Sequence, residues 1–333
     1  MRSSAIEQVH ERVYRVGTPL SGVETEIYLL LGDQVALVDS GVAQSVPDYL
    51  EPALAALDMA LSDIDFIINT HPHFDHAGGN AALKRASGVQ VLLHHADELL
   101  STGPEAFMDS RFDVSYYMRT LGREDLLAAR RALLEANVAE GTLVDHWLAG
   151  GDSIDLGQGI VLQVLHTPGH TAGSLSLYWP REEILFAGDS VQGRGSHPGL
   201  LPFYFHASEY LGSGTRLCDL PVAILCMGHG FQTGGIYNLP VRRGPTARET
   251  LRESVRVAEL IDRAVCAALD ANAPAQNLVE FARTTYGLLR YDLPLILDRD
   301  LGLPLQTLAT IDAHLAARCR TGAVPPSQGK GIP

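Results

Sequence analysis

Lysine is almost absent from this sequence: only Lys84 and Lys330 occur among its 333 residues. Enzymes that form a Schiff base need a lysine amine, and P-loop NTPases need the lysine of their glycine-rich loop, so both classes are nearly without a candidate. The formal net charge of −14 also lacks the basic excess that a nucleic-acid surface requires. We therefore expect no nucleic acid among the partners of this chain.

Two further absences concern disulfides and membranes. The four cysteines, Cys218, Cys226, Cys266 and Cys319, form no CxxC pair. They are interpreted as reduced, buried thiols, with Cys226 packed in a strand, rather than as a disulfide framework. The stretch MRSSAIEQVHERVYRVG lacks the apolar core of a signal peptide, and no run of about 18 apolar residues occurs. We therefore expect a cytoplasmic protein with no membrane partner.

Strand and helix patterns alternate along the first hundred residues. EIYLLLGDQVALVDSG predicts two strands about a Gly-Asp turn, IDFIIN predicts a short buried strand, and HAGGNAALKRAS predicts the start of a helix. VQVLLHH then returns as a strand. This alternation predicts an α/β protein with a mixed or parallel sheet and helices outside it.

Two segments interrupt or follow that alternation. Residues 101–147 contain REDLLAARRALLEANVAEG and are predicted to be a helical insertion. The chain is predicted to be helical again over 241–320, after a first domain over 1–240, and to end in a disordered tail over 321–333. Within 241–320, apolar residues recur at helical spacing at Leu251, Val255, Ala258, Ile261, Val265 and Ala268. The rest of the chain or a second copy must cover this stripe, which leaves a homodimer possible.

The stretch THPHFDHAGGN, residues 70–80, follows one of the predicted strands directly. It holds His71, His73, Asp75 and His76 within six positions. Zinc and similar ions bind imidazole nitrogens and carboxylate oxygens, about four to a site. Four such side chains are too many for one catalytic ion that keeps a water, but they suit two adjacent ions. No packing role requires these residue types at this spacing.

Further ligands are expected from other strand ends. His170 in HTPGHTAGS, Asp189 in FAGDS and His229 in CMGHG each follow an apolar strand and stand beside glycine, which lets the backbone turn sharply near an ion. The other histidines that follow predicted elements are not expected to bind metal. His94 and His95 are expected to cap a helix or to be exposed, and surface, packing or cleft-lining roles are left open for three more: His166, His197 and His206.

The series VALVDSG, THPHFDHAGG, HTPGHTAGS, FAGDS and GHG, in this order, resembles the metallo-β-lactamase superfamily. The resemblance implies that the first domain is an αββα sandwich with its site at the sheet edges. It also implies two divalent metal ions, zinc first, with iron or manganese as alternatives. By motif, the implied metal ligands are His71, His73 and His170 for one ion, Asp75, His76 and His229 for the second, and Asp189 as the bridge. Asp39 occupies the position of a carboxylate that orients ligands.

Departures from individual branches of the superfamily narrow the implied activity. Zinc β-lactamases carry no bridging aspartate at the place of Asp189, and many acylhomoserine-lactone hydrolases have a tyrosine where Gln192 stands. The helical part after GHG is most similar to thioesterase-like members. The resemblance therefore implies a hydrolase that cleaves a thioester, ester or lactone in a small hydrophobic substrate by means of a hydroxide shared between the ions. Asp75 would be the catalytic residue that holds this nucleophile and shuttles a proton.

Two segments rich in aromatic residues, FMDSRFDVSYYM and GLLPFYFHASEY, are expected to border the substrate cleft. Two other functions stay open at this point. One is a mononuclear-iron oxygenase similar to persulfide dioxygenases, which would use His71 and His73. The other is a metal-bound regulatory protein whose hydrolase activity is incidental.

Overall fold

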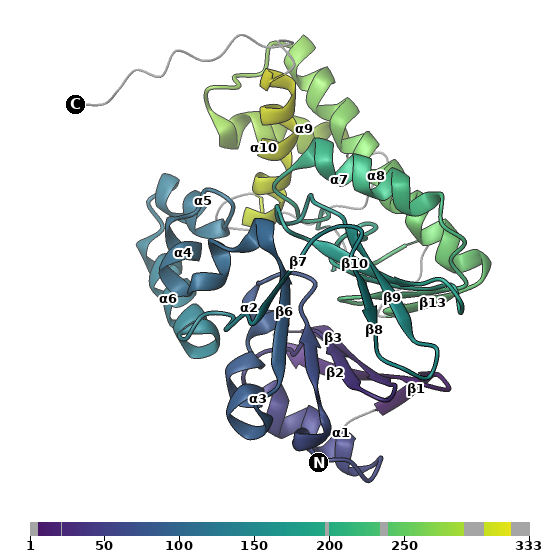
Figure 1. Cartoon of the computed structure of the whole chain (residues 1–333). Helices are drawn as coiled ribbons and strands as arrows, with labels where there is room; N and C mark the ends of the chain where they lie inside the picture. The colour runs from purple at the N-terminus through teal and green to yellow at the C-terminus, as the bar shows by residue number, and fades with distance from the viewer. Residues whose placement is uncertain (1–5, 21, 197–199, 234–238, 290–302, 321–333) are drawn as a thin grey trace.

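A computed structural model of the chain describes residues 6–20, 22–196, 200–233, 239–289 and 303–320. Two β-sheets pack face to face, and helices cover the outer face of each sheet (Figure 1). This is the αββα sandwich that the motif series predicted. The predicted tail, residues 321–333, lies outside the described residues.

The first sheet contains seven strands in chain order. Neighbouring strands are antiparallel from β1 to β4 and parallel from β4 to β7. The strands are β1 (Ile6–His10), β2 (Val13–Leu20), β3 (Val23–Leu31), β4 (Val35–Val38), β5 (Phe66–Ile68), β6 (Gln90–His94) and β7 (His146–Leu148). The two predicted strands about the Gly-Asp turn are β3 and β4, and IDFIIN forms β5.

The second sheet contains six strands in the order β13-β12-β11-β10-β9-β8. Only β11 and β12 are neighbours that run parallel, and the other pairs are antiparallel. The strands are β8 (Ser153–Asp155), β9 (Val161–His166), β10 (Leu175–Trp179), β11 (Ile184–Gly188), β12 (Ile224–Met227) and β13 (Val241–Arg243). As a result β9, β11 and β12 all point in one direction and end at the same edge of the sheet.

Helices fill the connections and the outer faces. The α-helices are α1 (Glu51–Ala55), α2 (Phe74–Ala77), α3 (Asn80–Ser87), α4 (Pro104–Asp109), α5 (Val114–Thr120), α6 (Glu124–Val138), α7 (Ala207–Cys218), α8 (Pro245–Asp270), α9 (Leu278–Leu289) and α10 (Leu305–Arg320). One π-helical turn spans Val46–Leu50, and 3-10 turns span Leu61–Asp63, His95–Asp97 and Leu100–Thr102. None of the helices in the described residues is long and apolar enough to cross a membrane.

Apolar side chains fill three layers of the sandwich. Between the sheets, Tyr28 and Val38 pack with Leu177 and Phe186. The outer face of the first sheet packs on α1 and α3, and the outer face of the second packs on α7 and α8. Cys226 of β12 is fully buried between the sheets, as predicted, and all four cysteines are free thiols.

Two short strands correct the sequence-based boundaries. The predicted insertion over 101–147 contains α4, α5 and α6, but its last residues already belong to β7 at the edge of the first sheet. Likewise, the region predicted to be helical from residue 241 begins with β13, and its first helix starts at Pro245. Three-residue edge strands are too short to display an alternating pattern, so no hydrophobic periodicity indicated them.

The apolar stripe of α8 is covered within the chain. Leu251, Ala258, Ile261 and Val265 are buried, while Val255 is only half-buried. The helix packs against α7, α9 and α10, beside which Figure 1 draws it. No second copy is therefore required to cover this stripe, and a homodimer stays a prediction.

We expect Ile261→Ala to lower the free energy of unfolding by about 2–5 kcal/mol, because this fully buried side chain would leave a cavity among α8, α9 and α10. Glu259→Ala, two residues away on the exposed side of α8, is the matched control and should change stability by less than about 0.5 kcal/mol. Urea denaturation of the full chain measures both. Equal, small effects would contradict the packing described for α8.

Candidate metal centre

The seven predicted ligands meet where strands of both sheets end. From the first sheet, His71 and His73 follow β5, and Asp75 and His76 lie in the short helix α2. From the second sheet, three ligands follow β9, β11 and β12, respectively: His170, Asp189 and His229. Because β9, β11 and β12 point the same way, their ends bring these three residues to one edge, where sites of α/β proteins usually form.

The first group consists of His71, His73 and His170. Nε2 of His170 lies 3.1 Å from Nε2 of His71 and 2.9 Å from Nδ1 of His73. All three side chains are buried. Their inward nitrogens all lie within 4.8 Å of one another, which is the spacing of atoms that can share one ion.

The second group consists of Asp75, His76 and His229. Nε2 of His76 and Nε2 of His229 are 3.2 Å apart, and a carboxylate oxygen of Asp75 lies 3.4 Å from the latter. Asp189 lies between the two groups. Its Oδ1 is 3.6 Å from Nε2 of His76, and its Oδ2 is 3.6 Å from Nε2 of His170.

Asp39 fixes the orientation of the ligands on the first sheet. Its carboxylate accepts hydrogen bonds from the backbone N–H of Thr70 at 2.7 Å, the hydroxyl of Thr70 at 2.9 Å and Nδ1 of His76 at 2.8 Å. The oxygen of Thr70 in turn lies 3.1 Å from Nδ1 of His71. Since these contacts hold the Nδ1 protons of His71 and His76, the Nε2 lone pair of each ring faces inward.

Backbone carbonyls orient the ligands on the second sheet in the same way. His170 donates from Nδ1 to the carbonyl of Phe203 at 2.6 Å, and His229 donates from Nδ1 to the carbonyl of Glu24 at 2.8 Å. A carbonyl can only accept, so both rings carry their proton on Nδ1. Their Nε2 lone pairs therefore point toward the neighbouring ligands.

The two ligand groups differ in the charge that their histidines favour. In the first, burial and the nearby imidazoles lower the pKa of His71, and burial lowers the pKa of His73 to about 3 and that of His170 as well. These rings are therefore neutral at physiological pH, which is the form that binds metal. In the second, burial disfavours charge, yet Asp189 and Asp75 raise the pKa of His229. The second group thus favours a positive charge, which is either a proton on Nε2 of His229 or a metal ion bound there in its place.

The cavity that the side chains enclose fits cations. Oδ1 of Asp189 is buried and accepts no hydrogen bond from the described residues, which would be costly for a carboxylate unless a cation lies beside it. Several imidazole nitrogens also face one another with their lone pairs, and too few protons are available to form hydrogen bonds between them. A Cβ at Gly228 would lie 2.4 Å from Oδ1 of Asp189, so only glycine leaves this space open. The donor set of nitrogen and oxygen atoms suits zinc, iron or manganese, and the role of these residues as ligands stays a prediction.

A cleft of about 540 Å³ opens from the ligands toward the helical insertion. It is mainly apolar. Residues from the two aromatic-rich segments line it, as predicted, together with residues of α6: Val114, Met118, Leu126, Ala129, Leu133, Leu200, Leu201 and Phe203. The cleft therefore offers an apolar space directly beside the candidate metal centre.

Sequence reasoning missed the ion pair in the wall of this cleft. Arg130 of α6 donates to the carboxylate of Asp113, a residue that is only 2% exposed. The guanidinium of Arg130 also lies 5.1 Å from the ring centroid of Phe74. Phe74 stands between His73 and Asp75 in the sequence. The pair thus ties the helical insertion to the turn that carries four of the candidate ligands, and nothing in the local sequence indicates it.

Gln192, which stands where many lactonases have a tyrosine, links two parts of the site. Its Nε2 donates to the carbonyl of Asp189 at 3.0 Å and to the carbonyl of Phe203 at 2.7 Å. Its Oε1 accepts from the backbone N–H of Phe203. Gln192 therefore fixes the carbonyl that orients His170, a role that only the fold reveals.

The loop that carries His170 has its own buried support. Asp97 accepts from the hydroxyl of Thr171 at 2.6 Å and from the backbone N–H of Gly173 at 2.8 Å. Burial raises the pKa of Asp97 to about 6, and the two hydrogen bonds partly offset this effect. This carboxylate was also not predicted.

The remaining histidines lie outside the ligand groups. His94 is buried and accepts from the backbone N–H of Ala96, which is the predicted capping role, and His95 is exposed. His166 lines a separate groove rather than the cleft, and His206 precedes α7, where its ring lies beside that of Phe112. His197 is outside the described residues.

Comparisons with known proteins agree with this fold. The family model of the metallo-beta-lactamase superfamily matches residues 22–229. The acyl-coenzyme A thioesterase MBLAC2 of Bos taurus is 33% identical over 225 residues, which are 64% of this chain and 72% of that protein. The hydroxyacylglutathione hydrolase of Brucella ovis is 29% identical over 182 residues, or 53% of this chain and 52% of that protein. Both relatives are hydrolases.

Two solved structures support the fold alone. The metallo-beta-lactamase family protein from Thermus thermophilus superposes with a TM-score of 0.66 at 23% identity, over 98% of each chain. The beta-lactamase domain protein from Burkholderia ambifaria gives 0.67 at 17% identity, over 99% of this chain and 92% of that one. The family match, the hydrolase relatives and the shared architecture together show that this chain belongs to the metallo-beta-lactamase superfamily.

Proposed function

We propose that the chain is a dinuclear metal-dependent hydrolase that cleaves the acyl bond of a small hydrophobic substrate, and that this bond is a thioester. The observation that carries the proposal is the convergence of two ligand groups with Asp189 between them. Two ions, zinc first, would be held by His71, His73 and His170 and by Asp75, His76 and His229. The apolar cleft beside them would bind the acyl group.

Two ions held by these residues would lower the pKa of a bound water toward about 7 and polarise an acyl carbonyl. The chain supplies the remaining functions. Asp75, which is only partly buried, reaches the end of the cleft, where its carboxylate can hold the attacking water and receive its proton. It can then pass that proton to the departing sulfur or oxygen. Leu201 and Phe203 exclude solvent from the acyl carbonyl.

Two observations support a thioester substrate over an ester or a lactone. The chain aligns with 72% of a protein named as an acyl-coenzyme A thioesterase. In addition, the apolar lining of the cleft from α5 and α6 fits an alkyl or aryl acyl group. Gln192, whose side chain is occupied by the backbone of Asp189 and Phe203, has no atom left to replace the phenol that many lactonases have at that position.

The proposal is tested with a hydrolysis panel on metal-replete full-length protein. Acetyl-, octanoyl- and palmitoyl-coenzyme A, an acylhomoserine lactone and an aryl ester are compared by kcat/KM. We expect a thioester to be the best substrate. Oxygen consumption with glutathione persulfide in place of hydrolysis would indicate an iron oxygenase instead, and no turnover in any assay would favour a regulatory protein.

The variant Asp189→Asn tests whether the chain binds one metal ion or two. The carboxylate of Asp189 offsets the repulsion between two dications, so we expect the wild type to hold two ions per chain and the variant to hold fewer. Turnover should fall by about 10²-fold or more. Elemental analysis and thioester hydrolysis measure both quantities. Wild-type protein that saturates at one ion in excess zinc, iron and manganese would reject the dinuclear assignment.

Leu133→Trp should reduce the space for the acyl group, because Leu133 lines the cleft. We expect kcat/KM for octanoyl-coenzyme A to fall by about tenfold, while that for acetyl-coenzyme A changes little. Ala132→Trp, on the exposed side of the same helix, is the matched control and should leave both values unchanged. A uniform loss for both substrates would mean that the acyl group does not bind along α6.

A further inference from the structure

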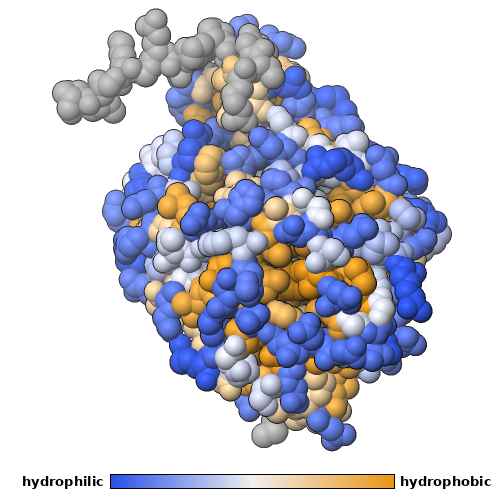
Figure 2. Space-filling view, in the orientation of Figure 1, coloured by the Kyte–Doolittle hydropathy of each residue, from blue (hydrophilic) through white to orange (hydrophobic). Residues whose placement is uncertain are grey.

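A second concavity lies on the outer face of the second sheet, away from the cleft. This groove has a volume of about 920 Å³ and runs between β9 and the C-terminal end of α7. Figure 2 shows an apolar hollow rimmed by hydrophilic residues in the region where Figure 1 draws β8 and β9. Among the described residues, none lines both the groove and the cleft.

The groove exists because the helices do not reach the end of the sheet. Helices α7 and α8 cover β10, β11 and β12, where Leu185 and Leu225 are fully buried. Strand β9 lies beyond this cover. Its inward residues are buried, whereas on the outward side Val161 is 39% exposed, Gln163 is exposed, and Leu165 is half-buried at the margin of the cluster beneath α7 and α8. An outward-facing strand normally carries polar residues at such positions, so these apolar side chains indicate a surface that binds something.

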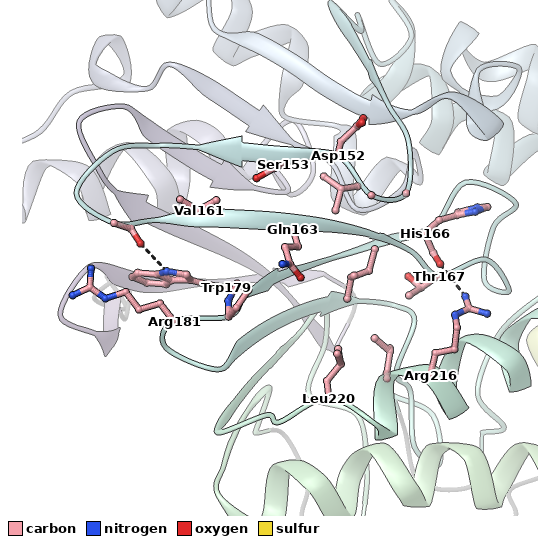
Figure 3. A pocket seen from close by; sticks show the side chains of 17 residues that line it. Asp152, Ser153, Val161, Gln163, His166, Thr167, Trp179, Arg181, Arg216 and Leu220 are labelled. Carbon is pink, nitrogen blue, oxygen red and sulfur yellow. Dashed lines mark hydrogen bonds between the residues drawn. The ribbon is translucent and has the colours of Figure 1, made fainter.

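Charge at the ends of the groove indicates the chemistry of that ligand. Figure 3 draws Arg216 at one end and Arg181 beside Trp179 at the other. Arg216 donates through Nη2 to the carbonyl of His166 at 3.0 Å and to the hydroxyl of Ser213 at 3.3 Å. Among the described residues, no carboxylate lies within ion-pair distance of its guanidinium, although the chain carries a net charge of −14.

Only one acidic residue, Asp152, occurs among the described residues that line the groove, and its carboxylate already accepts from the backbone N–H of Ala149 at 2.7 Å. Arg181 differs from Arg216, because it has Glu182 as an ion-pair partner at 3.4 Å. Arg216 is therefore the cation in this groove that is available to an anion. Its remaining N–H groups can form charge-assisted hydrogen bonds with a carboxylate.

We propose that the groove binds a free fatty carboxylate, with the carboxylate at Arg216 and the alkyl chain along Val161, Leu165 and Leu220 toward Trp179. The apolar floor and the single available cation match a ligand with one anionic end and a long apolar remainder. The volume is within the usual range for small-molecule sites. This inference does not depend on the proposed hydrolysis, and its test involves no turnover.

The chain carries its own reporter of the groove. Its two tryptophans are Trp147 and Trp179. Trp179 lies at one end of the groove, where its indole is 2% exposed, packs with the core between the sheets and donates from Nε1 to the carbonyl of Gly159 at 3.0 Å. In a Trp147→Phe background, all tryptophan fluorescence comes from Trp179. A bromine atom on the alkyl chain of a ligand bound in the groove would quench this fluorescence at short range, without contact with the buried indole.

The experiment titrates full-length Trp147→Phe protein with 11-bromoundecanoate. We expect saturable quenching that unlabelled undecanoate reverses. Arg216→Gln should weaken binding by about tenfold or more, because it removes the charge-assisted hydrogen bonds. Val161→Asp should weaken it as well, since it adds a like charge to the floor. Arg263→Gln, an exposed arginine of α8, is the control and should bind as the parent does.

The uncharged analogue 11-bromoundecanol tests whether the carboxylate matters and should bind at least about tenfold more weakly than the acid. Circular dichroism verifies that each variant is folded. The proposal is overturned by an absence of saturable quenching, by equal affinity for acid and alcohol, or by unchanged affinity in folded Arg216→Gln protein. It is also overturned if light scattering finds a dimer that Val161→Asp dissociates, because a second copy would then occupy the groove.

Discussion

Imidazole nitrogens that carry lone pairs face one another at 2.9–3.2 Å in the interior of this protein, and the surrounding structure must hold them there. Such an arrangement is repulsive unless a cation lies between the nitrogens. The fold therefore fixes four of the rings, those of His71, His76, His170 and His229, from their far sides. Asp39 and Thr70 do this for the first sheet, and backbone carbonyls do it for the second. The strand directions, the turns after the strands and the glycines beside the ligands all help to hold these nitrogens close together.

Support for the site extends to the C-terminal helices. The hydroxyl of Thr310 in α10 donates to the carbonyl of Pro202 at 2.7 Å. The hydroxyl of Tyr204 lies 2.8 Å from Nε2 of His314, which is also in α10. These contacts hold the segment that contains Phe203, whose carbonyl orients His170. The helices after the catalytic motifs are thus structural partners of the candidate metal centre, in addition to covering one another.

The sequence predicted the fold and the seven converging residues because their chemistry is local. Histidine and aspartate at strand ends, spaced as in THPHFDH, have few other uses, and their order along the chain resembles one superfamily. The parts that were missed carry no such signature. The carbonyls of Glu24 and Phe203 belong to the backbone, which is the same at every position. Asp97 and Arg130 act through contacts between distant segments, and β7 and β13 are too short to show a period.

The hydrogen bond between His229 and the carbonyl of Glu24 joins residues 205 positions apart, and that between Thr310 and Pro202 joins residues 108 positions apart. A chain is synthesised from its N-terminus, and contacts between distant residues form late in folding. The THPHFDH turn therefore leaves the ribosome long before its partners exist. Because α10 holds the segment that contains Phe203, the cage of candidate ligands can reach the geometry described here only after α10 has been synthesised.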